Sequence, residues 1–198
     1  MKSNNDMEFI KSKIENWYAN KPITSLKAES KELFGYEIED GGVPKEMEDG
    51  EPDKEGYVRW KITPSKISDL ELQGIEKEYK LQFPELYKLY LMAYCHLGIN
   101  LKFGDRRIFL PALPSDCPLK EIEFELNAWK PLLNAGFIPF ADFEDGWGPV
   151  CFDTLNDCQI VWFEHEELFN SNFEKNAGFD KFKRKICSGF KELYECLC

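Results

Sequence analysis

Three residues in the second half of the chain have the types that nucleophilic catalysis uses. Cys151 is a candidate nucleophile, His165 a candidate base, and Asp153 a candidate for orienting the base. Cys151 and Asp153 are two apart in a segment that alternates like a strand, so they would share one face. No glycine-rich segment that could stabilise an oxyanion precedes Cys151, and a buried cysteine that packs as a small apolar side chain explains it better. We therefore predict no catalytic residue.

Metal and phosphate sites have little support. The two histidines, His96 and His165, are isolated, and neither belongs to the two-histidine motif of a zinc-protease helix. Cys196 and Cys198 form a terminal pair without the second half-site that a four-ligand zinc site needs. The sequence has no Walker-type loop and no Gly-x-Gly-x-x-Gly motif. We predict a non-enzymatic protein that uses no metal and no cofactor.

Charge narrows the class of partner. The formal net charge is −11. Residues 131–174 contain nine acidic residues and no Lys or Arg, and residues 35–59 contain nine acidic and three basic residues. Phosphate groups require a basic protein face, so nucleic acid and anionic membranes are not expected partners. A basic protein is the expected partner.

One acidic and aromatic surface is the candidate binding site. The glycines around Trp147 permit a tight bend, and this indole either closes the end of a sheet or anchors a partner. Glu166 and Glu167 also suit the start of a helix. The acidic segment of residues 36–57 is a solvated linker, or a lid that extends the same surface. The predicted partner-binding residues are Asp142, Glu144, Asp145, Trp147, Glu164, Glu166 and Glu167.

The elements that would position this surface are strands joined by tight turns. Alternating residues predict three consecutive strands at Phe137–Ala141, Val150–Thr154 and Gln159–Phe163, with a hairpin turn at Leu155–Cys158. Further strands are expected at Tyr57–Ile62, Leu101–Phe103 and Arg107–Leu110.

Helical spacing predicts several helices around these strands. The first carries Phe9, Ile10, Ile14 and Trp17 on one face, and a short second helix after Thr24 turns Leu26, Ser30 and Leu33 inward. Ser68 and Glu71 form a capping box for a third helix, and Pro84 starts a fourth that Gly98 ends. The fifth turns Leu119, Ile122, Leu126 and Trp129 inward, and the last runs from Phe179 to about Leu197. Helices, a group of strands and a final helix indicate an α+β fold with a mostly antiparallel sheet.

The cell compartment follows from the cysteines and the N-terminus. Seven cysteines without regular spacing predict free thiols. The N-terminal segment is amphipathic rather than a signal peptide, and no apolar run reaches the roughly 20 residues of a membrane span. We expect a cytoplasmic protein.

The ordered motifs resemble the SUKH superfamily over about residues 60–170. The first part is Leu72 to Tyr87, a helix with an acidic residue, a Phe83-Pro84 step and a second helix. The second part contains Ile138–Ala141, the turn Asp145–Gly148, Asp153, and Val161-Trp162 followed by His165-Glu166. Phe83 replaces the leucine that is usual before the proline, and residues 1–59 extend beyond the minimal domain.

The resemblance implies a SUKH-like α+β domain and a binding function. Bacterial members are mostly immunity proteins, so the expectation is a single domain over residues 1–198, with 1–59 as a helical and acidic elaboration of the 60–198 core. It would neutralise a cognate toxin, plausibly a basic nuclease, by occluding it, most simply as a monomer. The alternatives are a regulatory scaffold related to cell-wall synthesis and signalling, and an enzyme that uses Cys151.

Overall fold

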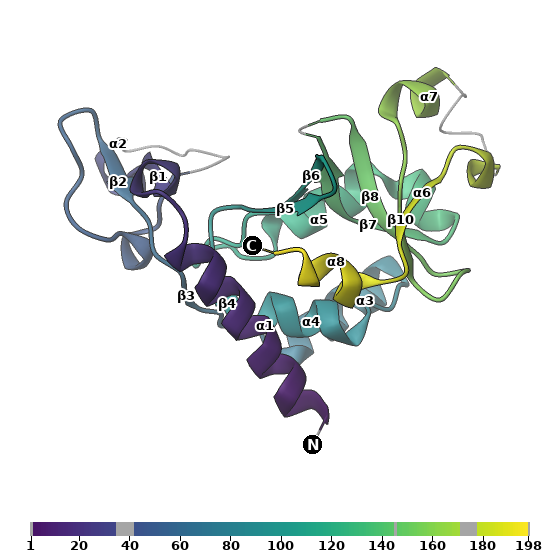
Figure 1. Cartoon of the computed structure of the whole chain (residues 1–198), viewed down its shortest axis with the longest axis horizontal. Coiled ribbons are helices and arrows are strands. Elements are labelled where there is room, and N and C mark those ends of the chain that lie inside the picture. Colours follow the sequence, from purple (N-terminus) through teal and green to yellow (C-terminus); the bar gives the residue numbers. More distant parts are fainter. Residues whose placement is uncertain (1, 35–41, 145, 171–177, 198) are drawn as a thin grey trace.

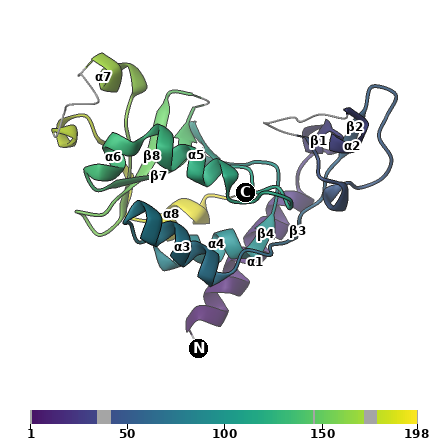
Figure 2. The same cartoon turned by 180° about the vertical axis from the view of Figure 1, so that it is seen from behind.

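The computed structural model describes residues 2–34, 42–144, 146–170 and 178–197. Its main feature is a six-stranded sheet with helices on both faces (Figures 1 and 2). The strands lie side by side in sequence order, from β5 to β10, and every adjacent pair is antiparallel. The predicted α+β class is confirmed.

The first helix is close to its prediction. Helix α1 (Lys2–Ala19) buries Ile10, Ile14 and Trp17 and packs against α4 (Glu85–Ala93). These three side chains belong to the same hydrophobic core as the residues of the sheet. The N-terminal helix therefore contributes to the main core.

Short elements replace the predicted second helix. They are η1 (Ile23–Leu26), β1 (Lys27–Glu29) and α2 (Lys31–Phe34). Further along, the chain forms η2 (Lys45–Met47), β2 (Tyr57–Arg59), which is the first half of the strand predicted at Tyr57–Ile62, and β3 (Thr63–Pro64). Leu26 and Ser30 are buried as expected, but Leu33 is 59% exposed. Strand β1 pairs with β2, which lies almost 30 residues further on, and this pairing outweighs the local helical spacing.

The predicted capping box is present at the start of α3 (Asp69–Tyr79). The Ser68 hydroxyl accepts a hydrogen bond from the Glu71 amide, and the Glu71 carboxylate accepts one from the Ser68 amide. Helix α4 begins directly after Pro84, one residue later than predicted because Pro84 is its N-cap, and it ends before Gly98. It ends early because β4 (Tyr94–Cys95) leaves the helix and pairs with β3.

Five of the six strands of the large sheet were predicted. The strands are β5 (Ile99–Phe103), β6 (Arg106–Leu110), β7 (Phe137–Phe143), β8 (Gly148–Asp153), β9 (Gln159–Trp162) and β10 (Arg184–Cys187). Strand β6 pairs with β7 only through Ile108 and Phe109, opposite Phe143 and Asp142. Helices α5 (Lys120–Ala128) and α6 (Lys130–Asn134) also pack against β7.

Alternation along the strands separates two apolar clusters. Ile138, Phe140, Phe152 and Ile160 belong to the main core, where the Tyr87 ring contacts Phe140 and Phe152. The smaller cluster contains Leu132, Phe137, Cys151, Val161, Phe163, Leu168 and Phe179. Strands buried on both faces form a rigid platform for the turns at their ends.

The single helix predicted from Phe179 to Leu197 is wrong. The chain forms η4 (Phe179–Lys181), strand β10 and helix α8 (Phe190–Glu195). Strand β10 pairs with β9, so its conformation is set by a tertiary contact that overrides the helical spacing of the apolar residues. Helix α7 (His165–Asn170) precedes them.

Two expectations about the chain as a whole have partial answers. No helix within the described ranges is long and apolar enough to cross a membrane. The six described cysteines, all except Cys198, are free thiols, in agreement with the prediction.

Candidate protein-binding surface

Trp147 lies in the turn between β7 and β8 and is held there by backbone contacts. Its amide donates a hydrogen bond to the Phe143 carbonyl oxygen at 2.9 Å, and its own carbonyl oxygen accepts one from the His165 amide at 2.9 Å. The His165 ring also lies close, with Nδ1 at 3.2 Å from the same oxygen. Even so, 48% of Trp147 is exposed. The turn presents the indole to solvent and attaches its backbone to the start of α7.

Gly148 makes this attachment possible. Its φ of +140° is a conformation that side chains disfavour. A Cβ at this position would lie 2.0 Å from the Phe163 carbonyl oxygen and 3.0 Å from the His165 amide nitrogen. Only glycine therefore allows the β7–β8 turn to approach the segment between β9 and α7.

The acidic residues of the turn have local partners. Asp142 accepts hydrogen bonds from the amides of Phe143 and Gly146 and so shapes the turn. Glu144 has a φ of +51°, and its carboxylate lies 3.7 Å from an Nη of Arg106. Asp145, another predicted site residue, lies outside the described residues.

The acidic residues at α7 also differ in role. The Glu164 carboxylate accepts hydrogen bonds from the amides of Glu166 and Glu167, so it caps the start of the helix. Glu167 forms an ion pair with Arg184 at 2.7 Å. Glu166 is exposed and is the member of this group best placed to meet a partner directly.

The predicted surface is less acidic than the sequence indicates. Its own segment lacks cations, but β6 contributes Arg106 and β10 contributes Arg184. The guanidinium carbon of Arg106 lies 5.4 Å from the Trp147 ring centroid, and that of Arg184 lies 4.8 Å from the ring centroid of Trp162. Our sequence reasoning missed both arginines because neighbouring strands bring them in from distant parts of the chain.

An aromatic pair continues the surface across the sheet. Phe143 and Trp162 stack with ring centroids 4.1 Å apart and an interplanar angle of 16°. Phe143 is almost fully buried, whereas Trp162 is partly exposed. Together with Trp147, they place aromatic side chains from β7, the turn and β9 at one end of the sheet.

Glu125 on α5 adds a titratable group near Asp142. Burial is the main cause that raises the pKa of Glu125 to about 7, and the charge of Asp142 acts in the same direction. A hydrogen bond from the Trp129 side chain acts against them. The sequence alone gave no signal for this carboxyl, because its surroundings come from a strand and a helix that are distant in sequence.

The three residues weighed for catalysis have separate surroundings. Cys151 is fully buried, and burial raises its thiol pKa well above the ordinary value. This direction is opposite to the low pKa that a cysteine nucleophile needs. His165 instead contacts the Trp147 turn, and no hydrogen bond within the described residues joins Cys151 to either candidate partner.

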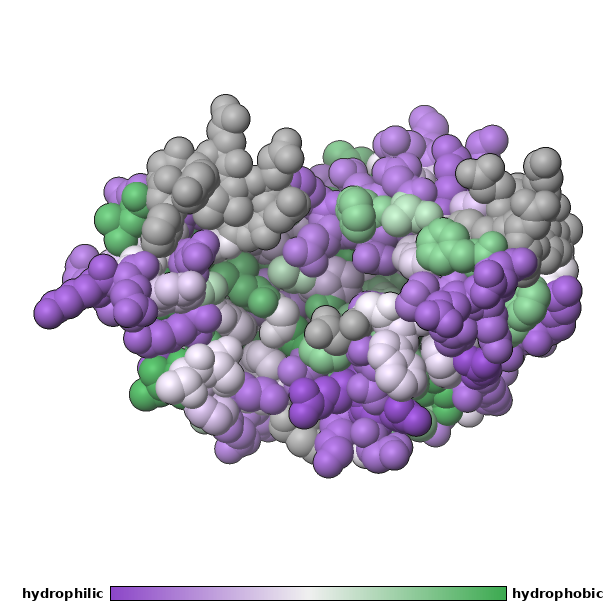
Figure 3. Space-filling view, turned by 90° about the horizontal axis from the view of Figure 1, so that it is seen from above, coloured by the Kyte–Doolittle hydropathy of each residue, from purple (hydrophilic) through white to green (hydrophobic). Residues whose placement is uncertain are grey.

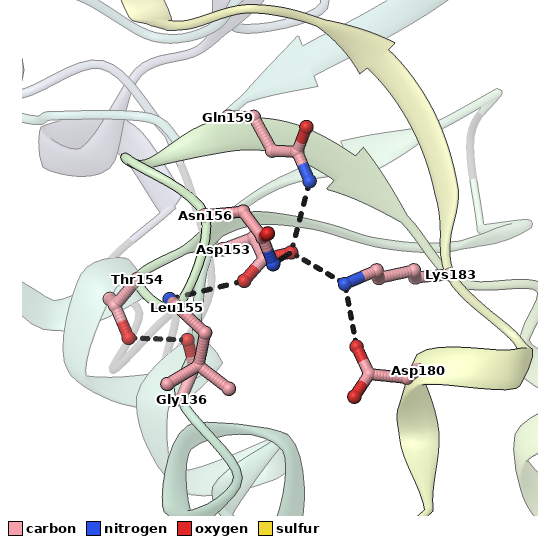
Figure 4. Close-up of polar contacts among 8 residues, drawn as sticks. All are labelled: Gly136, Asp153, Thr154, Leu155, Asn156, Gln159, Asp180 and Lys183. Carbon is pink, nitrogen blue, oxygen red and sulfur yellow. Dashed lines mark hydrogen bonds and ion pairs between the residues drawn. The ribbon is translucent and has the colours of Figure 1, made fainter.

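Asp153 connects the β8–β9 turn to the segment before β10 (Figure 4). Its fully buried carboxylate accepts hydrogen bonds from the Asn156 and Gln159 side chains and from Lys183 Nζ at 2.9 Å. Lys183 also pairs with Asp180. Burial acts to raise the Asp153 pKa, but these hydrogen bonds outweigh it and hold the pKa below its usual value. Asp153 therefore has a structural role in this part of the sheet.

Part of the acidic 36–57 segment is packed rather than solvated. Residues 36–41 lie outside the described residues, but Val43, Met47 and Glu48 are buried. The Glu48 carboxylate accepts a hydrogen bond from Ser30 and pairs with Lys45. This part of the segment is anchored to the N-terminal elements, which disagrees with a free linker.

A shallow pocket beside this segment has a volume of about 540 Å³. Lys31 pairs with Asp116 at 2.8 Å, and Lys45 pairs with Glu32 at 2.8 Å, so charges of the pocket wall are balanced internally. No group of three or more His, Cys, Asp or Glu residues in the described part of the chain could hold a metal ion. The turn around Trp147 therefore has the strongest features of a recognition site.

Comparison with known proteins returned no match, either to a protein-family model or to a curated protein.

Proposed function

We propose that this chain is a protein-binding domain that neutralises a toxin protein by occluding it, as an immunity protein of the SUKH type does. The observation that carries the proposal is the exposed indole of Trp147 on a fixed turn. A large aromatic side chain that is already ordered loses little conformational freedom on binding, and tryptophan is enriched among residues that dominate interface energy. The resemblance of the motifs to SUKH domains supplies the toxin as the kind of partner.

The net charge supports a basic toxin, plausibly a nuclease. A charge of −11 attracts a positively charged protein over a distance of about a Debye length, ~8 Å at physiological salt. Glu166 and the other carboxylates at α7 lie beside the aromatic anchor, so attraction and docking would act at one end of the sheet. The protein would act in the cytoplasm, as a monomer bound to one toxin domain.

Affinity capture tests this proposal. The immobilised protein is exposed to lysate and secreted material from its source strain and close relatives, and bound proteins are identified by mass spectrometry. We expect one toxin domain at equal stoichiometry. Trp147→Ala should weaken its binding at least about tenfold.

Leu155→Ala is the matched control, because Leu155 is 67% exposed in the β8–β9 turn at the opposite end of β8. It should bind as the wild type does. Retention of cell-wall enzymes instead of a toxin, or equal binding by Trp147→Ala, would contradict the proposal.

A further inference from the structure

Two arginines of the candidate surface have the same kinds of neighbouring side chain. Arg106 lies over Trp147 and beside Glu144, and its side chain is 48% exposed. Arg184 lies over Trp162 and beside Glu167, and its side chain is 43% exposed. In each case an indole ring supports the guanidinium group and a glutamate restrains it. Each guanidinium group therefore has an aromatic and an acidic neighbour, while a large part of its side chain stays accessible.

Arg106 and Arg184 lie on the same face of the sheet. Arg184 is the register partner of Trp162, and Trp162 stacks on Phe143. Phe143 is the register partner of Ile108, and Arg106 is two residues before Ile108, so it shares that face. The row runs from β10 to β6 and leads to the Trp147 turn.

Figure 3 looks onto this end of the molecule. Hydrophobic residues, in green, and hydrophilic residues, in purple, lie side by side over the sheet half, on its right. This mixture fits a contact surface of mixed polarity rather than a purely apolar groove.

The chemistry of a guanidinium group defines the acceptor. It has five N–H donors in a rigid plane, which match the two oxygens of a carboxylate. Arg184 directs one Nη to Glu167 at 2.7 Å. Arg106 lies 3.7 Å from Glu144 through one Nη and 3.9 Å from Asp105 through Nε, both beyond hydrogen-bond distance. These contacts leave donor capacity on both groups, and each guanidinium group lies within cation–π distance of an indole ring.

We infer that Arg106 and Arg184 form the centre of the partner-contact surface and bind carboxylate side chains of a protein partner. This inference rests on the proposed function and specifies it. A uniformly basic partner surface would be repelled at the centre by two arginines. The partner should therefore present acidic side chains at the centre of its contact surface and basic side chains around them, opposite Glu166 and the net negative charge.

A random peptide library displayed on phage tests this chemistry without the toxin. It is selected against the wild type, against Arg106→Lys combined with Arg184→Lys, and against Arg107→Lys. Lysine retains the charge but lacks the planar donor set. Arg107 is the matched control because it is exposed on the same strand but points to the opposite face from Arg106.

We expect wild-type selections to enrich peptides that contain Asp or Glu beside an aromatic residue. A synthesised peptide should bind the double lysine variant at least about tenfold more weakly, and the Arg107→Lys variant with unchanged affinity. Replacing its Asp and Glu by Asn and Gln should cause a similar loss. The indole N–H signals of Trp147 and Trp162 should shift on binding of the acidic peptide.

Three outcomes would overturn the inference: enrichment of Lys and Arg peptides, equal recovery on the double lysine variant, or no enrichment at all. Capture of a toxin decides the proposed function separately. A captured toxin together with any of these outcomes would leave the function standing and remove the two arginines from the centre of the contact. Selection of acidic peptides without capture of a toxin would support carboxylate binding by the two arginines and would leave the proposed function without support.

Discussion

The Arg106 guanidinium lies over the ring of Trp147 at 5.4 Å, and this contact joins residues that are 41 positions apart. The arginine is on β6 and the indole is in the β7–β8 turn, so the pair forms only when the sheet is complete. It places a cation beside the Trp147 turn of residues 131–174, a segment that contains no Lys or Arg of its own. The charge of this surface thus depends on the tertiary fold as well as on the local composition.

Replacing Gly148 by alanine should disorder the Trp147 turn. The new Cβ would meet the Phe163 carbonyl oxygen at 2.0 Å, so the turn must move away from α7. We expect a loss of at least about 2 kcal/mol in the free energy of unfolding, measured by urea denaturation.

Gly146→Ala is the control for backbone strain alone. Gly146 also has a positive φ, of +97°, but a Cβ there would have no heavy atom within 4 Å. It should cost only about 1 kcal/mol, the strain of a side chain at positive φ. Equal losses for the two variants would contradict the close approach at Gly148.

Much of the sheet was predictable because local residue patterns specify its strands. β7, β8 and β9 alternate and are separated by glycine-rich or polar turns, and the capping box at Ser68 specifies the start of α3. These signals act within a few residues. They identify β7 and β8, the two strands that the Trp147 turn connects.

The missed features are those that distant residues determine. Strand β10 has apolar residues at helical spacing around it, and pairing with β9 gives it an extended conformation. Arg106 and Arg184 reach the surface through sheet register, which a count of charges over a contiguous segment does not capture. The Ser188-Gly189 pair was an available signal that a helix does not run through this region.

Lys183→Met should destabilise the protein strongly. It removes a cation that lies 2.9 Å from the fully buried carboxylate of Asp153. Leaving one partner of a buried pair without the other costs roughly 3–5 kcal/mol, which urea denaturation would show. Adding Asp153→Asn to Lys183→Met removes the unpaired charge, so the double variant should recover part of the loss. A double variant as unstable as the sum of both single variants would contradict this account.

Acid should destabilise the protein through His96. This ring is fully buried; the Gly98 amide donates to Nδ1, and Nε2 lies 2.7 Å from the Tyr90 hydroxyl oxygen. Burial lowers the His96 pKa from 6.5 to about 3, so between these values the unfolded state binds a proton that the folded state excludes. Stability should therefore fall as the pH falls through this range, by at most about 1.4 kcal/mol per pH unit from this residue.

The contribution of His96 is measured by comparing His96→Gln with the wild type at several pH values between 7 and 4. The substitution lowers stability at neutral pH, but its loss on acidification should be smaller than that of the wild type. Parallel pH profiles would show that His96 does not carry this dependence.

Glu125 should have the opposite effect at higher pH. Its pKa is raised to about 7, so between pH 4.5 and 7 the folded state holds a proton that the unfolded state has lost. The contribution of this residue to stability is present below pH 4.5 and is lost as the pH rises through 7. The free energy of unfolding of the wild type should therefore fall between pH 5 and pH 8. In Glu125→Gln this fall should be smaller by on the order of 1 kcal/mol. An unchanged difference between the two pH values would show that Glu125 titrates normally.

The central claim, neutralisation through the Trp147 surface, is tested most directly by titrating the activity of the captured toxin with purified protein. The wild type and Leu155→Ala should abolish the activity at one equivalent. Trp147→Ala should leave residual activity at the same ratio and need a larger excess of protein for full neutralisation, while retaining wild-type stability, because the indole is 48% exposed. Toxin activity that persists at excess wild-type protein, or equal neutralisation by Trp147→Ala, would contradict the account.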